Sequence, residues 1–291
     1  MKPPPFAYFD PTTLEEALGL KAQHGLDASV LAGGQSLVPL LNMRLASPEV
    51  LVDTNRVDGL GGLRRSNGTL ELGSMVRQYV LEDDEVVAQA VPLLAAAARH
   101  VGHRENRHRG TVGGSLAHAD PAAELPCLAL VLSAELVARS NRGERVIPAS
   151  DFFDGFMSTV LQPDEILTAV RIPVPAGNVG WGFEEVARRF GDFALAAAAA
   201  LVTLGDDGSV ASASVALAGV SDTPVRATEY EQALVGTDPT PDNVASAARI
   251  IERLVTTSDD IHATQVYRRK VAAVTASRAV TAAVNRARGG E

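Results

Sequence analysis

The chain has 291 residues, which suits two or three domains of roughly 100 to 150 residues each. Its 46% hydrophobic and 21% charged residues are typical of a globular protein and exclude a disordered one. Lys and Arg number 26 against 35 Asp and Glu, and the net charge of −9 argues against generic binding to nucleic acid.

The first residues and the apolar runs indicate where in the cell the protein is expected. Residues 1–5 contain no apolar segment of the kind a signal peptide needs, and the longest apolar runs, such as residues 194–204, fall far short of the ~20 residues of a membrane span. We therefore expect a cytoplasmic protein with no membrane span.

The chain has a single cysteine, Cys127. It excludes an internal disulfide, and an iron–sulfur cluster usually needs about four Cys ligands. Redox chemistry in this chain would therefore need an organic cofactor. Cys127 precedes an apolar run, which favours a small buried hydrophobic residue.

The first 55 residues predict alternating helices and strands. Overlapping capping boxes at Thr12 and Thr13 start a helix that Gly25 ends. The pattern then predicts a strand, a glycine loop, a short helix and a strand at residues 29–31, 32–36, 37–45 and 50–52.

The middle of the chain predicts a short strand at residues 70–72 and a helix over 92–101, with Pro92 at its first position and Gly102 after its end. A basic, polar stretch at residues 103–109 leads into a second small-residue loop at 110–115. A strand over 166–172 ends at two prolines, where we place a domain boundary near residue 176.

Beyond this boundary the pattern predicts a small α+β domain over residues 177–291. Apolar stretches at 195–204 and 210–220 flank a hairpin signal at 205–209, and two amphipathic helices start at about Thr240 and Thr264. The alanine run at 196–200 is compatible with a tightly packed strand or helix.

Two adjacent glycines occur twice, at 33 and 34 and at 113 and 114, each pair with a serine close behind. Glycine permits a positive φ and a close approach to the backbone, so successive N–H groups can point at an anion beside a helix N-terminus. Each loop alone is compatible with an ordinary turn. Together they predict a clamp around one pyrophosphate.

Other known site patterns are absent or incomplete. The chain contains no Rossmann, P-loop or Gly-x-Ser-x-Gly fingerprint. His118, Asp120 and Cys127 faintly match the zinc deaminase pattern, but Leu130 stands where the second cysteine is needed, so zinc lacks a ligand. His118 is then compatible with a loop residue bonded to backbone.

Glu124 and the basic stretch at 103–109 each have two possible interpretations from the sequence. Glu124, near Asp120, can hold a ribose hydroxyl or cap the helix expected around Pro126. The basic stretch at 103–109 can contact a phosphate or a partner, or can be ordinary solvated charge.

Three segments resemble the FAD-carrying medium subunits of the molybdenum hydroxylases, which include xanthine, carbon monoxide and N-heterocycle dehydrogenases. LAGGQSLVPLLNMRLASP (31–48) and HRGTVGGSLAHADPAAELP (108–126) are similar to the two FAD-binding signatures of this family, and RRFGDFALAAAAA (188–200) is similar to a third block. The resemblance implies an α+β protein. Its FAD-binding region would have two α/β subdomains of vanillyl-alcohol oxidase and p-cresol methylhydroxylase type, at about 1–55 and 56–176, before the domain at 177–291.

The resemblance also implies an FAD site without catalytic or metal-binding residues. We expect the FAD to bind noncovalently, because neither glycine loop offers a Cys or His tether. Its first loop would wrap the pyrophosphate and its second would close on the other side. Glu124 would contact the adenosine ribose, and Asp192 and Phe193 would lie beside the isoalloxazine ring. The implied residues are Leu31, Ala32, Gly33, Gly34, Gln35, Ser36, Leu37, Val38, Val101, Thr111, Val112, Gly113, Gly114, Ser115, Glu124, Leu167, Asp192 and Phe193.

Three positions depart from frequent family residues. Gln35 replaces the His of carbon monoxide dehydrogenases, Ser115 replaces a frequent Asn, and Phe193 replaces a frequent Tyr. The first departure argues against carbon monoxide, and the variants look closer to enzymes that hydroxylate N-heteroaromatic rings. The loss of the Tyr hydroxyl removes a possible hydrogen bond near the flavin.

The family implies a complex in which this chain is active only with its partners. A large subunit would carry the molybdenum cofactor and a small subunit two [2Fe-2S] clusters, as a dimer of heterotrimers. This chain would take electrons from the small subunit and pass them to an external acceptor. The alternatives are a stand-alone flavin oxidase and a non-catalytic nucleotide-binding module.

Overall fold

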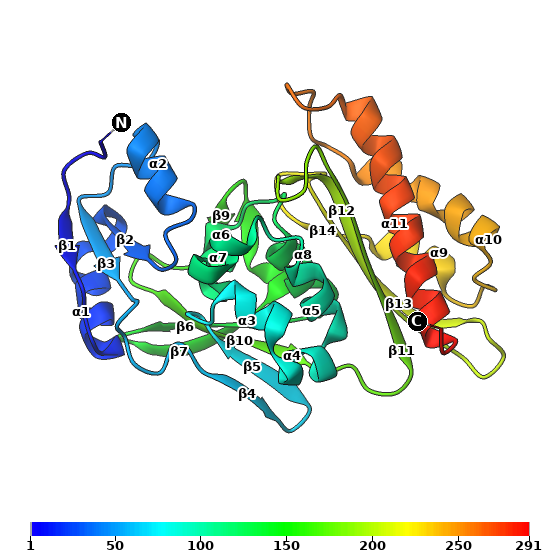
Figure 1. Ribbon diagram of the computed structural model, residues 1–291, viewed down its shortest axis with the longest axis horizontal. Helices are drawn as coiled ribbons and strands as arrows, with labels where there is room; N and C mark the ends of the chain where they lie inside the picture. Colours follow the sequence, from blue (N-terminus) through cyan, green and yellow to red (C-terminus); the bar gives the residue numbers. More distant parts are fainter. Residues whose placement is uncertain (1, 291) are drawn as a thin grey trace.

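The computed structural model describes residues 2–290 and combines helices with sheets, which confirms the predicted α+β class. Figure 1 shows three parts in a row: a small amino-terminal layer, a central sheet with its helices, and a carboxyl-terminal sheet with one long helix beside it.

The amino-terminal layer is a parallel sheet with strand order β1-β3-β2. Its elements are β1 (Ala7–Phe9), α1 (Leu14–His24), a 3-10 turn (Gly25–Asp27), β2 (Ala28–Leu31), α2 (Leu37–Met43) and β3 (Val50–Asp53). The Thr13 hydroxyl accepts a hydrogen bond from the Glu16 N–H at 3.2 Å, and Gly25 ends α1 with φ 51°. Both predicted ends of this helix are therefore confirmed to within two residues.

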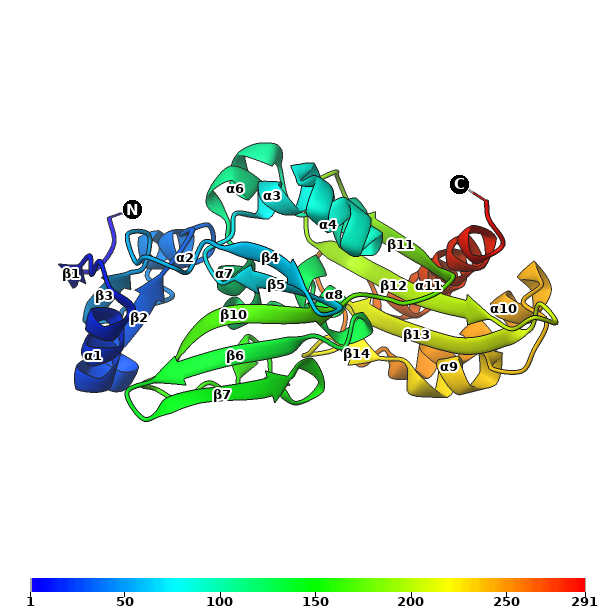
Figure 2. The ribbon, with the colours of Figure 1, turned by 90° about the horizontal axis from the view of Figure 1, so that it is seen from below.

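The central sheet is antiparallel, with strand order β4-β5-β10-β6-β7, and its strands lie side by side in Figure 2. The strands are β4 (Leu63–Ser66), β5 (Thr69–Gly73), β6 (Glu135–Ser140), β7 (Gly143–Pro148) and β10 (Ile166–Pro173). A small hairpin of β8 (Phe153–Gly155) and β9 (Ser158–Thr159) precedes β10, after a 3-10 turn (Ala149–Asp151).

Six short helices connect β5 to β6: α3 (Gln78–Asp83), α4 (Glu85–Ala90), α5 (Pro92–Ala98), α6 (Arg104–Arg109), α7 (Val112–His118) and α8 (Glu124–Val131). Pro92 opens α5 as predicted, but α5 ends at Ala98 and not at 101, because the N–H groups of His100 and Val101 form tighter three-residue turns. The stretch at 103–109, predicted only as polar chain, is the helix α6.

The carboxyl-terminal sheet is antiparallel in the order β11-β12-β13-β14. Its elements are β11 (Val179–Ala187), β12 (Ala194–Leu204), β13 (Val210–Ala218), β14 (Val225–Arg226), α9 (Thr228–Leu234), α10 (Pro241–Ala247), a 3-10 helix (Ala248–Leu254) and α11 (Gln265–Ala287). Thr240 and Thr264 cap α10 and α11 as predicted, whereas β11 and α9 were not predicted.

The alanine run in β12 is a buried strand that separates two hydrophobic cores. Ala197 and Ala199 face the core shared with the central part, and Ala196 and Ala198 face the core beneath α11. Alanine suits this position because both faces of the sheet are covered closely. On β11, a Cβ at Gly180 or Gly182 would overlap backbone carbonyls of α11.

Candidate functional site

A cavity of about 500 Å³ opens where the three parts meet. It is lined by β2 and the loop after it, by α6 and α7, by the start of β10, and by the loop between β11 and β12. Small-molecule sites commonly occupy ~300 to 1,000 Å³. Because the lining segments are far apart in sequence, only the folded chain forms this cavity.

The loop between β2 and α2 lines the cavity and contains a row of backbone N–H groups without an acceptor among the described residues. Within residues 2–290, the N–H groups of residues 33–37 donate no hydrogen bond to the protein, and the first bond of α2 runs from the Val38 N–H to the Gly34 carbonyl. Gly34 makes this turn possible with φ +73°. The loop therefore has free N–H donors of the kind that can bind an anion.

The second glycine pair is not an open loop. It forms the first turn of α7, and Thr111 caps this helix by accepting a hydrogen bond from the Gly114 N–H at 3.0 Å. The N–H groups of Val112, Gly113 and Ser115 donate to protein carbonyls as well. The prediction of a second phosphate-facing row of N–H groups was wrong, because helix formation and contacts with residues 74–76 use these groups.

The glycines bring the two segments into direct contact. A Cβ at Gly33 would overlap the Arg109 carbonyl oxygen and lie 2.7 Å from the Gly110 Cα, and a Cβ at Gly114 would lie 3.5 Å from the Cβ of Ala32. The two predicted signatures therefore meet in space, although the second contributes packing and side chains more than free N–H groups.

A polar bridge ties the first loop to the second segment. The Asn55 side chain donates to the Ala32 carbonyl at 2.8 Å and accepts from Arg77 at 2.6 Å. Arg77 also donates to the Arg109 carbonyl. The relative position of the two segments is thus held by hydrogen bonds as well as by glycine contacts.

Two carboxyl groups have raised pKa values: Glu124, which is buried at the cavity, and Glu185, which is partly buried on the carboxyl-terminal sheet. Glu124 begins α8, lines the cavity and is 5% exposed. Burial and, to a smaller extent, the Asp120 charge raise its pKa to about 7, against the lowering effect of a backbone hydrogen bond and of Arg107. For Glu185 on β11, burial and the Glu124 charge raise the pKa to about 8. The Glu185 Oε2 atom has no hydrogen-bond partner among the described residues.

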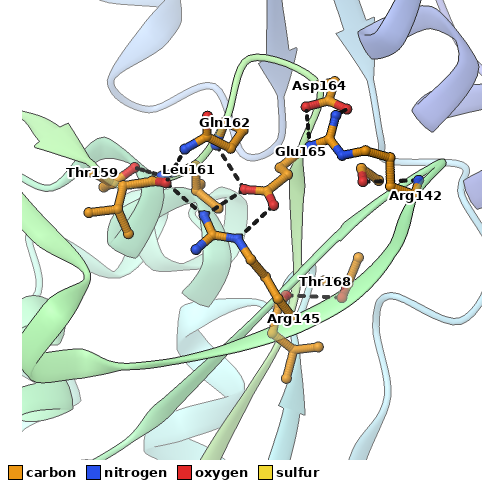
Figure 3. A network of polar contacts seen from close by, with 11 residues as sticks. Arg142, Arg145, Thr159, Leu161, Gln162, Asp164, Glu165 and Thr168 are labelled. Carbon is orange, nitrogen blue, oxygen red and sulfur yellow. Dashed lines mark hydrogen bonds and ion pairs between the residues drawn. The ribbon is translucent and has the colours of Figure 1, made fainter.

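One wall of the cavity is held by the polar network in Figure 3. Arg145 on β7 forms two hydrogen bonds with Glu165, of 2.7 and 2.8 Å, and donates to the Val160 carbonyl. Glu165 also accepts from the Gln162 N–H at 2.8 Å. These contacts fix the loop before β10, so that Glu165 and Leu167 line the cavity.

Another part of the cavity lining comes from the turn after α5, from α6 and from the loop between β11 and β12. Val101, Asn106, Asp192 and Phe193 line it, and Phe193 is 61% exposed. An exposed aromatic side chain at the rim of a cavity suits contact with a flat ligand or with a partner protein.

Most of the predicted site residues line this one cavity: Ala32, Gly33, Gly34, Gln35, Ser36, Leu37, Val101, Thr111, Gly113, Gly114, Ser115, Glu124, Leu167, Asp192 and Phe193. Three do not. Leu31 ends β2, Val38 lies on the exposed side of α2, and Val112 packs in the central core.

The sequence interpretation missed several polar lining residues: Ser29, Thr54, Ser74, Gln78, Asn106 and Glu165. Asn106 carried a usable signal, because it interrupts a run of charged residues immediately before the second signature. The others stand on neighbouring strands and turns with no motif of their own.

One residue of the basic stretch, Arg107, and the cysteine have structural roles. Arg107 is buried, pairs with Glu82 at 2.9 Å and donates to the carbonyls of Val101 and Gly102, so its charge is already used inside the protein. Cys127 is fully buried, as predicted, and burial raises its pKa to about 12. Within residues 2–290, no helix is both long and apolar enough to cross a membrane.

Comparison with known families covers almost the whole chain. The family described as FAD binding domain in molybdopterin dehydrogenase matches residues 4–175, and the CO dehydrogenase flavoprotein C-terminal domain matches residues 181–283. The chain belongs to the FAD-binding medium subunits of the molybdenum hydroxylases. Members of this family are subunits of oxidoreductases, and the resemblance inferred from the sequence is confirmed.

Individual relatives agree in sequence and in structure. The chain is 42% identical to the caffeine dehydrogenase subunit beta of Pseudomonas sp. (strain CBB1), over 98% of this chain and 97% of that protein. It superimposes on quinoline 2-oxidoreductase from Pseudomonas putida 86 with a TM-score of 0.94 and 38% identity, covering 99% of both chains. For carbon monoxide dehydrogenase from Hydrogenophaga pseudoflava, the TM-score is 0.96 and the identity 36%, covering 98% of this chain and 99% of that chain.

The cavity fits the cofactor of this family. The row of free N–H groups at residues 33–37 matches the charge of a pyrophosphate, and the cavity continues from this loop both to the buried Glu124 and to Phe193 at its rim. An extended dinucleotide needs such a central anion site with room on both sides.

Proposed function

We propose that the chain binds FAD noncovalently in this cavity and relays electrons from a [2Fe-2S] subunit to an external acceptor. The observation that carries the proposal is the loop at residues 33–37, which lines a cavity large enough for a ligand and whose N–H groups have no acceptor within residues 2–290. Neither glycine loop, at residues 31–38 and 110–115, contains a Cys or His that could tether the flavin, which supports noncovalent binding.

Within the proposed site, the first loop would hold the pyrophosphate, and the Glu124 carboxyl group would form hydrogen bonds with ribose hydroxyls. Phe193 would cover part of the flavin ring and, in place of a tyrosine, would supply packing without a hydroxyl. Bound FAD would supply one- and two-electron redox chemistry. No residue of this chain is assigned an acid or base role toward the organic substrate.

We further propose a small [2Fe-2S] subunit and a large molybdenum-cofactor subunit as partners, in a dimer of heterotrimers in the cytoplasm. An N-heteroaromatic substrate is supported by the names of two relatives, caffeine dehydrogenase and quinoline 2-oxidoreductase. We also propose a domain boundary near residue 176, where Gly177 has φ +81° between the two matched families.

The test is the visible spectrum of the purified full chain and of its complex before and after denaturation. Release of FAD into the supernatant on denaturation is expected, and its absence would overturn the proposal. Steady substrate turnover by the isolated chain would instead favour a stand-alone oxidase. Flavin that no reductant or partner cluster bleaches would favour a non-catalytic nucleotide-binding module.

A further inference from the structure

Asn106 lies between two segments that line the cavity, the loop at residues 33–37 and the loop between β11 and β12. It lies on α6 and lines the cavity; its amide nitrogen donates to Gln35 of another segment, and its amide oxygen caps the start of its own helix at His103. We propose that Asn106 is a positioning residue that couples the loop at 33–37 to the loop that carries Phe193. This inference rests on the proposed function, because it concerns how the chain would hold FAD.

The first contact reaches the anion-binding loop. The Asn106 Nδ2 donates to the Gln35 Oε1 at 3.0 Å, and the Gln35 Nε2 donates to the Gly33 carbonyl at 3.3 Å. Gln35 therefore braces the loop from within and is itself held by Asn106. The loop presents its N–H groups in one arrangement only while this brace is in place.

The second contact fixes the turn before α6. The Asn106 Oδ1 accepts a hydrogen bond from the His103 N–H at 3.1 Å. Gly102 makes this turn with φ +51°, and a Cβ there would lie 3.4 Å from the Asn106 Cβ. The position of His103 thus depends on the same amide that holds Gln35.

His103 in turn touches the loop between β11 and β12. Its ring lies 6.5 Å from the Phe190 ring, and a Cβ at Gly191 would lie 2.7 Å from the imidazole. Gly191 has φ +85° and, with Asp192 and Phe193, lines the cavity. The contacts from Gly33 through Asn106 to Gly191 form one continuous path around the cavity.

Both side chains in the central hydrogen bond are neutral amides. Their contact carries no charge to titrate, so we expect the brace to stay intact over the pH range in which Glu124 changes its charge. A neutral brace also keeps negative charge away from the loop that would hold the phosphates.

The experiment uses the full chain with Gln35→Met, Asn106→Leu and both together. FAD affinity is measured by titrating the flavin-free chains, and flavin spectra are recorded on the FAD-saturated chains. Each single variant should weaken FAD binding about fivefold, on the scale of one hydrogen bond, and the double variant should be no weaker than Asn106→Leu alone. The visible circular dichroism of the flavin should change in all three, although neither residue is placed at the ring. Glu105→Gln is the control and should match the wild type, because the exposed Glu105 side chain on the same helix makes no hydrogen bond or ion pair within residues 2–290 and does not line the cavity.

The outcomes separate the two proposals. Wild-type flavin spectra in FAD-saturated Gln35→Met and Asn106→Leu, or additive losses of affinity, would overturn the coupling and leave FAD binding intact. Gln35→Met keeps the test valid if Asn106→Leu disturbs α6, because Gln35 is exposed and lies outside that helix. Absence of flavin from the wild-type chain would overturn the proposed function and this inference together.

Discussion

The two glycine pairs of this chain look alike in sequence and do different work in the structure. The pair at 33 and 34 opens a loop whose N–H groups remain free for a ligand, whereas the pair at 113 and 114 starts a helix whose N–H groups are all bonded. Gly113 is needed for another reason, because a Cβ there would lie 2.8 Å from the Ser74 Cα.

This difference shows that a glycine motif indicates a close contact with the backbone but does not indicate whether a ligand or another part of the protein makes that contact. At Gly34 the requirement is a positive φ, and the backbone beyond it faces a cavity. At Gly113 the requirement is space for the turn after β5, at Ser74. The predictions below test whether the first pair governs ligand binding and the second governs folding.

The largest effect is expected for Gly113→Ala. Its Cβ would collide with the backbone at Ser74, and we expect a loss of about 3 kcal/mol in the free energy of unfolding. Urea unfolding of the full chain measures it. Gly61→Ala is the control, because a Cβ there meets no atom within 4 Å. Equal unfolding midpoints for the two variants would contradict the packing role of the second pair.

The second prediction concerns pH. The first glycine loop, residues 31–38, contains no titratable side chain, whereas Glu124 and Glu185, which follow the second glycine pair in the sequence, have raised pKa values. A carboxyl group whose pKa is raised by folding stabilises the protein at low pH and loses this contribution as the pH rises through the folded value. For Glu124 and Glu185 these values are about 7 and about 8.

Glu185→Gln should therefore be more stable than the wild type by about 2 kcal/mol near pH 9 and nearly equal to it near pH 5. The measurement is urea unfolding of the full chain across this pH range. Glu184→Gln is the matched control, because Glu184 lies on the other face of β11, the face of Gly182 and α11. A constant difference between variant and wild type at all pH values would contradict the raised pKa.

Gly34→Ala is expected to act on the ligand more than on the fold. A non-glycine residue at φ +73° costs about 1 kcal/mol, and the new Cβ would lie 3.2 Å from Val38. We expect FAD to bind about fivefold more weakly, with only a small change in the unfolding midpoint. Fluorescence titration of the flavin-free chain measures this affinity, and an unchanged affinity would remove the distinction between the two pairs.

The smallest effect is expected for Thr111→Val, which removes the cap on the Gly114 N–H. The expected loss is about 0.5 kcal/mol in the free energy of unfolding, with FAD affinity changed less than twofold. Thr111→Ser keeps the hydroxyl and should behave like the wild type. A large loss of FAD affinity in Thr111→Val alone would mean that this hydroxyl, and not the first loop, dominates binding.

Local sequence patterns correctly predicted those helices and hairpins whose ends are marked by capping residues or by glycine-rich turns. Thr13 and Gly25 predicted both ends of α1, Thr264 predicted the start of α11, and the turn at 205–209 predicted the β12–β13 hairpin. They failed for α6, whose charged residues have no apolar face, because Arg107 is buried by its pairing with Glu82 far away in sequence. They also failed for the N–H groups of the second pair, which bond to residues 74–76.

The sequence by itself determined the family, the α+β class and the segments that form the cavity, because these depend on local spacing, capping and glycine placement. Only the tertiary structure decided which N–H groups remain free, that Asn106 and Glu165 line the cavity, and that Glu185 faces the buried Glu124 region. These features depend on contacts between segments tens of residues apart, which no local pattern of residues encodes.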